Sequence, residues 1–191
     1  MTAISNEELL YQRLYISADD LHHAHSYASH LIKKGWHYAP WERRWSTYMQ
    51  QAAFTSAFVT AYSRPFTRSV GWPSFPARSL PFDPQEEIFH KHLLELRHQV
   101  YAHSDSARHT VKPMRIYGHT SAIVGSPFLR LQKEELERSI MLIIKIQASI
   151  SNELTQLMLA IEAGPNRSAH ADTQHQVAAS RRMSRAGGLQ R

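Results

Sequence analysis

One stretch of the chain, residues 93–105, combines a cation, two imidazoles and a helical apolar pattern. Arg97 could hold a phosphate group, because its guanidinium is permanently cationic and presents a fork of N–H donors to phosphate oxygens. His98 and His103 could move protons, because imidazole titrates close to neutral pH. RNA carries its own nucleophile, the 2′-hydroxyl beside each phosphate. These three side chains therefore have the chemistry that RNA cleavage requires, without a metal ion.

The position of this stretch on a helix decides whether those side chains can act together. Apolar residues recur at alternating spacings of four and three, the pattern of one helical face: Phe89, Leu93, Leu96 and Val100. His103 continues the series, whereas Arg97 lies on its flank. Residues six apart on a straight α-helix differ by about 240° of rotation, so these two would not share a face. We expect them to converge only where the helix unwinds near Ala102, or where two copies of the helix meet.

Arg97, the polar His98, residues 99–102 and His103 form a motif that resembles the Arg–spacer–His signature of the HEPN superfamily. This superfamily comprises small helical domains that are common in prokaryotic toxins and antiviral systems. The continuation Ala-His-Ser-Asp at residues 102–105 is similar to members related to the AbiU-type abortive-infection proteins. The position of the motif at the close of an amphipathic helix, after two long ones, makes the resemblance more specific.

The resemblance implies an all-α, up-and-down bundle of four main helices and a metal-independent endoribonuclease of the toxin or defence type. Its composite site would form at the interface of a homodimer, with His103 as general acid or base and Arg97 as the phosphate clamp. His98 would orient or assist. The products would carry a 2′,3′-cyclic phosphate and a 5′-hydroxyl. RNA would be the substrate, and an antitoxin or a nucleotidyltransferase would be a partner.

Three further residues are weaker candidates for contacts around such a site. Tyr101 and Asp105 lie within or beside the motif, where they could support its side chains or contact RNA. Arg64 stands at the end of the second predicted helix. There it could face the cleft, or it could neutralise the negative end of the helix dipole.

A hypothesis without catalysis explains the same residues. Arg97 could pair with a carboxylate, and His103 could stabilise the C-terminal end of its helix through the dipole. The long apolar seams would then belong to a non-catalytic, HEPN-like module that dimerises or binds another protein. Substitution of either residue would affect stability or assembly but no reaction.

Other kinds of chemical site find little support in the sequence. The chain has no cysteine, which excludes disulfides and thiolate metal sites. Several histidines cluster on the first predicted helix, but no carboxylate stands at a recognised metal-binding spacing: His22, His23, His25 and His30. There is no glycine-rich phosphate loop and no Gly-x-Ser-x-Gly sequence. We therefore expect neither a metal nor a cofactor.

The 191 residues are most simply one helical domain, residues 1–163, followed by a basic tail, residues 164–191. The formal net charge is +6, and the tail contributes to it with five arginines and a single acid, Asp172. Its richness in Ala, Ser, Gln, His and Arg is typical of disorder. No signal peptide or membrane-spanning segment is visible, so we expect a cytoplasmic protein that does not bind membranes.

Capping patterns predict where the positioning helices begin and end. Ser5 and Glu8 form a capping box for a helix over residues 6–34, which Gly35 ends. A second helix is expected over residues 41–63, because Pro65 disfavours helical geometry in the residue before it. The sequence Asp-Pro-Gln-Glu at residues 83–86 starts a third helix, which runs to about residue 102 and carries the motif.

The remaining segments complete this architecture. Residues 64–83 form a proline-rich loop whose aromatic side chains are expected to cover the core rather than contact substrate: Phe66, Trp72, Phe75 and Phe82. Within residues 104–127 a short hairpin is expected around a set of apolar residues: Val111, Met114, Ile116 and Tyr117. A fourth, well-buried helix runs from about residue 130 to Gly164 and Pro165.

Overall fold

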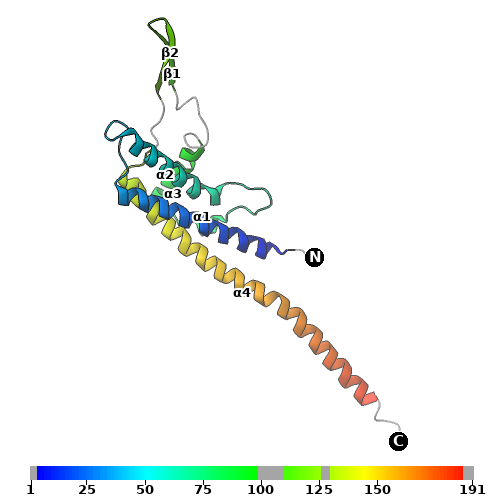
Figure 1. The fold of residues 1–191 in the computed structure, drawn as a ribbon. Coiled ribbons are helices and arrows are strands. Elements are labelled where there is room, and N and C mark those ends of the chain that lie inside the picture. The colour runs from blue at the N-terminus through cyan, green and yellow to red at the C-terminus, as the bar shows by residue number, and fades with distance from the viewer. Residues whose placement is uncertain (1–3, 99–109, 126–129, 187–191) are drawn as a thin grey trace.

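The computed structural model describes residues 4–98, 110–125 and 130–186, with side chains described as far as residue 163. Within these ranges the protein is mainly helical (Figure 1). The α-helices are α1 (Asn6–Lys34), α2 (Trp45–Ser63), α3 (Pro84–Leu96) and α4 (Lys133–Ala186), and two 3₁₀ turns are η1 (Arg64–Phe66) and η2 (Ala77–Ser79). β1 (Thr110–Ile116) and β2 (His119–Gly125) form one antiparallel pair. The expected helical character and the hairpin are thus confirmed.

Helix α1 has the boundaries that its caps predict. The Ser5 side chain accepts a hydrogen bond of 3.1 Å from the Glu8 backbone N–H, and the Glu8 carboxylate accepts one of 2.8 Å from the Ser5 N–H. Gly35 ends the helix with a φ of 64°, a conformation that L side chains rarely adopt. Because these signals lie within a few residues of one another, the sequence alone was enough to place both ends.

The core lies where α1 packs against α2 and α4. Helix α4 contributes a continuous apolar face to it, and the fully buried side chains of that face are Leu136, Leu142, Ile143, Ile146 and Ile150. Burial of one such side chain stabilises the fold by about 1.5–3 kcal/mol. Helix α3 packs against α2. Helix α3 is therefore attached through α2 to the group of packed helices.

The start of α2 differs from the prediction. The helix begins at Trp45 rather than at residue 41. The preceding connector is fixed by Gln51, whose side-chain amide donates to the Tyr38 carbonyl at 2.9 Å and accepts from the Tyr38 N–H at 3.0 Å. The Glu42 side chain also accepts a bond of 2.7 Å from the Ala39 N–H. These contacts hold the connector in turns, so that helical geometry begins later.

The end of α4 also differs from the prediction. The helix does not stop at Gly164 and Pro165 but continues to Ala186, so the expected disordered tail at residues 164–186 is helical. A proline inside a helix costs about 3 kcal/mol, which made this boundary plausible. The residues beyond it are rich in Ala, Gln and Arg, which favour helical geometry. In Figure 1 this part of α4 extends away from the other helices.

The hairpin turns through Tyr117 and Gly118, whose φ angles are 49° and 83°. Two consecutive residues with positive φ are typical of the tight turns that suit the twist of paired strands. The register pairs Ile116 with His119, next to the turn. Figure 1 shows the hairpin standing away from the helices. Among the described helices, none is both long and apolar enough to cross a bilayer.

Candidate functional site at the end of α3

The first turn of α3 is firmly fixed. Asp83 accepts a bond of 2.8 Å from the Glu86 N–H, and Glu86 accepts one of 3.0 Å from the Asp83 N–H, as the capping sequence predicted. Lys145 of α4 also forms an ion pair with Glu86 and lowers the pKa of that carboxyl. Arg138 of α4 lies over the Phe89 ring, 4.5 Å from its centroid. The beginning of α3 is therefore attached to α4.

The opposite end of α3 departs from α geometry. The α-helix ends at Leu96, and the hydrogen-bonding pattern of Arg97 and His98 is that of a wider π-helical turn. The expected α-helix to about residue 102 is therefore wrong at Arg97 and His98, and residues 99–102 lie outside the described residues. Widening the turn changes the direction in which the next residues project, because each turn then contains more residues. The change begins at the arginine of the motif.

The structure describes two of the motif residues. Arg97 is half-buried and His98 is exposed. In the part of the chain that the structure describes, no carboxylate forms an ion pair with Arg97. Tyr101, His103 and Asp105 lie outside the described residues. The predicted convergence of Arg97 and His103 therefore stays a prediction.

Arg64 is directed to another part of the molecule. Its Nη1 lies 3.2 Å from Oδ1 of Asp20 on α1, an ion pair that joins residues 44 positions apart. Arg64 also lines a pocket of about 240 Å³ together with α1 and α2 residues that include His23 and Tyr27. No residue of α3 lines this pocket. Arg64 is therefore an anchor between α1 and the end of α2, and Arg97 does not line this pocket.

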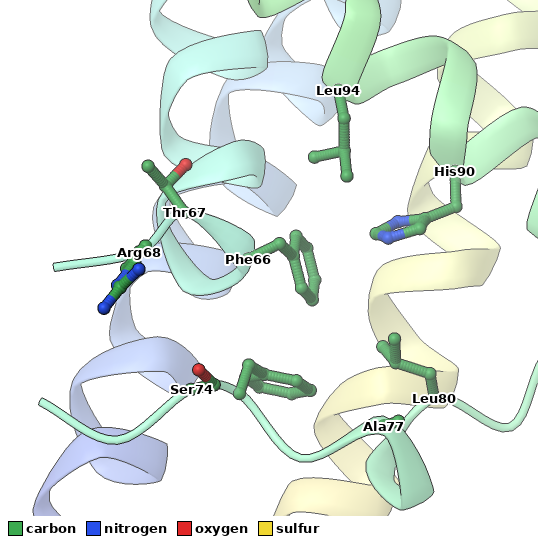
Figure 2. A pocket seen from close by; sticks show the side chains of 9 residues that line it. Phe66, Thr67, Arg68, Ser74, Ala77, Leu80, His90 and Leu94 are labelled. Atoms are coloured by element: carbon green, nitrogen blue, oxygen red, sulfur yellow. The ribbon is translucent and has the colours of Figure 1, made fainter.

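A second pocket, of about 300 Å³, lies between α3 and the proline-rich loop (Figure 2). Apolar side chains form most of it, and polar ones complete its lining: Phe66, Thr67, Arg68, Ser74, Phe75, Ala77, Leu80, His90 and Leu94. The expectation that the loop's aromatic residues cover the core is confirmed for Phe66, Phe75 and Phe82, which pack against it. The pocket itself was not predicted.

His90 is the titratable group of this pocket. Its ring is buried, and Nδ1 lies 2.8 Å from the hydroxyl of the buried Tyr62. Burial lowers the pKa of His90 to about 4, while Glu87 opposes that shift and Lys91 adds to it. Burial also raises the pKa of Tyr62. At neutral pH both groups are uncharged, so the pocket contains a neutral imidazole.

Arg13 of α1 fixes the loop side of the pocket. Its Nη2 donates to the carbonyl of Pro65 at 2.6 Å and to that of Thr67 at 3.1 Å. These two carbonyls flank Phe66, so the arginine holds the backbone that carries this ring. The position of Phe66 therefore depends on a buried cation, not only on apolar packing.

The histidines of α1 have other neighbours. The His30 ring stacks on Phe54, with centroids 4.4 Å apart, and His23 lies 3.8 Å from the Asp19 carboxylate. Among the described residues, no group of three or more His, Asp or Glu side chains could hold a metal ion. The cluster that stands out in the sequence is therefore divided between packing and surface contacts.

Sequence reasoning missed His90, although one signal was present. His90, Leu94 and Arg97 follow the i, i+4, i+7 spacing, so they share a face of α3. No protein-family model, no curated protein and no solved structure matches this chain. The function of this chain must therefore be inferred from the geometry of His90, Leu94, Arg97 and their neighbours.

Proposed function

We propose that the protein is a metal-independent endoribonuclease that acts as a homodimer, with Arg97, His98 and His103 of two copies around one cleft. One histidine removes the proton of a 2′-hydroxyl, and O2′ attacks the adjacent phosphorus. The bond to the 5′-oxygen breaks, and a second histidine protonates that oxygen. Arg97 neutralises the charge that develops on the phosphate oxygens. The products are a 2′,3′-cyclic phosphate and a 5′-hydroxyl.

The observation that carries this proposal is the geometry at the end of α3. Arg97 stands where α geometry gives way to a wider turn, and π-type turns occur frequently at functional sites. A straight α-helix would keep Arg97 and His103 on different faces. A change of helical phase that begins at Arg97 supports their convergence. The lack of an ion-paired carboxylate among the described neighbours leaves the guanidinium charge for a phosphate.

The arrangement of helices also supports the proposal. A long α1, an α2 that packs against it, and an α4 whose apolar face covers α1 are what a HEPN-like, up-and-down bundle requires. The homodimer needs an exposed apolar surface, and α4 offers one with Met141, Ile144, Met158 and Leu159. RNA, and in the organism an antitoxin or nucleotidyltransferase, are the proposed partners.

The same apolar surface favours one alternative, a non-catalytic module that dimerises through α4. Four large apolar side chains exposed on one helix are a typical feature of an interaction surface. In that case substitution of Met141 by Glu would disrupt assembly and would have no effect on any reaction. The proposed nuclease requires both assembly and cleavage.

The test is cleavage of a mixed panel of labelled RNAs in the presence of EDTA. The wild-type protein should cleave single-stranded RNA, and mass spectrometry should find cyclic phosphate ends. His103→Ala should lose the activity while its melting temperature stays close to that of the wild type. Arg44→Ala is the matched control, because it removes an exposed cation at the start of α2. RNA that stays intact across the panel, or a fully active His103→Ala protein, would contradict the proposal.

A further inference from the structure

The pocket that His90 lines and the Arg97 side chain lie along the same face of α3. His90 and Leu94 line the pocket, and Arg97 follows them on the same face at the i+7 position from His90. Seven residues of an α-helix correspond to about 10 Å along its axis. This distance is comparable with the length of a nucleotide from its base to a neighbouring phosphate. The pocket therefore lies where a group attached to a phosphate at Arg97 could reach it.

The walls of the pocket suit a flat aromatic group. In Figure 2 the ring of Phe66 and the imidazole of His90 are directed into the same space, with Leu80 and Leu94 beside them. Phe75 also lines this pocket. The Phe66 and Phe75 rings meet edge to face, with centroids 5.1 Å apart. A volume of about 300 Å³ is at the lower end for small-molecule pockets. It suits a single ring system rather than a larger ligand.

His90 supplies one directed polar group in this apolar setting. Among the described residues the Tyr62 hydroxyl has no other hydrogen-bond partner, so its proton is satisfied only when it donates to Nδ1 of His90. In the neutral ring the proton then lies on Nε2, which becomes a donor for a bound molecule. Nucleobases combine an aromatic face with ring acceptors at the edge, and therefore match both the stacking walls and this donor.

The charges around the pocket favour a polyanion over an uncharged ligand. Arg68 lines the pocket on the loop side, and in Figure 2 it lies on the opposite side from His90. Arg97 lies one helical turn beyond Leu94. Cations on both sides of an aromatic pocket are what a strand of RNA requires, because each base is flanked by phosphates.

We propose that this pocket is the base subsite of the nuclease: it takes one unstacked nucleobase of single-stranded RNA while Arg97 holds a neighbouring phosphate. The inference rests on the proposed function, because it places the scissile strand at Arg97. It also assigns the substrate class, since a base that is paired and stacked in a duplex cannot enter.

The test measures binding of an RNA that cannot be cleaved. The probe is a fluorescent 2′-O-methyl dodecamer, which lacks the nucleophile, and its reference is a fully abasic dodecamer of the same charge. Stacking of one base contributes about 1–3 kcal/mol, so the wild type should bind the base-bearing probe about 5- to 150-fold more tightly than the abasic one. Fluorescence anisotropy gives both dissociation constants.

Two substitutions fill the pocket. Ala77→Phe adds a ring at an exposed position of η2, and Leu80→Trp enlarges a partly buried side chain. Ala77→Phe tests the pocket even if Leu80→Trp fails to fold. Each should reduce affinity for the base-bearing probe to the abasic level and leave the abasic affinity unchanged. Ile123→Trp, on the exposed surface of the hairpin, is the matched control and should bind like the wild type.

Equal affinity of the wild type for the two probes, or an Ala77→Phe protein that binds bases normally, would overturn the inference. The outcome is independent of catalysis, because the probe cannot react. A protein that shows the base preference but cleaves no RNA would support the base subsite and contradict the proposed nuclease activity. A protein that cleaves RNA without the base preference would support the nuclease activity and contradict the base subsite.

Discussion

The two ends of α3 are built in opposite ways. At the first turn, Asp83 and Glu86 satisfy each other's backbone groups, and Lys145 and Arg138 attach the helix to α4. At the last turn, α geometry gives way at Arg97, and the His98 side chain is exposed. The same short helix is thus fixed at one end and open at the other.

Under the proposed function, this difference is how a small helical protein would position reactive side chains. Groups that bind or transform a substrate must reach solvent, yet must stay within a fraction of an ångström of a productive geometry. The fixed end of α3 and the buried Leu93 supply the rigidity, and the open end supplies the access. Substitutions at the two ends should therefore affect different properties, stability at one and activity at the other.

The largest effect on stability should come from Leu93, which anchors α3 in the core. Leu93 is fully buried, and Leu93→Ala should lower the free energy of unfolding by about 2–5 kcal/mol, because it removes apolar contacts and leaves a cavity. Urea unfolding measures the loss. His98→Ala, at the open end, should change stability by less than about 0.5 kcal/mol. Similar losses for the two variants would break the contrast between the ends.

The next effect is a change of stability with pH, which His90 should cause. Its pKa is about 4 in the folded protein and about 6.5 when unfolded, because burial penalises the charged ring. Between these values the unfolded chain binds a proton that the folded protein does not. Stability should therefore fall as the pH is lowered from about 6.5 towards 4.

The control for this pH effect is His90→Gln, which does not titrate and can still accept a bond from Tyr62. Its free energy of unfolding should change less between pH 6.5 and 4 than that of the wild type. The titratable neighbours Glu87 and Lys91 are present in both proteins, so the difference isolates His90. Identical pH profiles for the two proteins would show that the buried ring does not contribute.

A smaller loss of stability than that of Leu93→Ala should come from removing the cap of α3. Asp83→Ala removes the acceptor for the Glu86 N–H and should cost about 1 kcal/mol of stability. Thermal unfolding followed by circular dichroism measures this. Asp83→Asn is the control, because asparagine is as good a cap, and it should recover most of the loss. An Asp83→Ala protein that is as stable as the wild type would mean that Lys145 and Arg138 alone fix this end.

Local signals in the sequence predicted much of the fold. The capping boxes at Ser5 and Asp83, and the glycine at position 35, involve residues that contact one another along the chain, so pattern reading was enough. The end of α4 was missed because a single proline was given more weight than the helix-forming residues on both sides of it. The delayed start of α2 depends on Gln51, far from the predicted boundary.

The site could be predicted only in part. The candidate chemistry of Arg97 and His98 was inferred from residue type and spacing. The end of the α-helix at Leu96 was not predicted, because the apolar pattern favoured a helix to about residue 102. The pocket could not be predicted, because it depends on how the loop carrying Phe66 folds back against His90. The partner of Arg64 is similarly distant in sequence, since Asp20 lies on another helix. Contacts of this kind are set by tertiary structure and leave no local pattern.

The central claim is that the guanidinium of Arg97 acts on a phosphate of RNA, and chemical rescue tests it most directly. Cleavage rates in EDTA are compared for the wild type, for Arg97→Ala, and for Arg97→Ala supplemented with methylguanidinium. Removal of one preorganised charge donor should slow cleavage by about 10²- to 10³-fold. The added cation should restore part of the rate in a saturable manner, whereas methylurea should not. A wild type that leaves RNA intact, or an Arg97→Ala protein that cleaves at the wild-type rate, would contradict the claim.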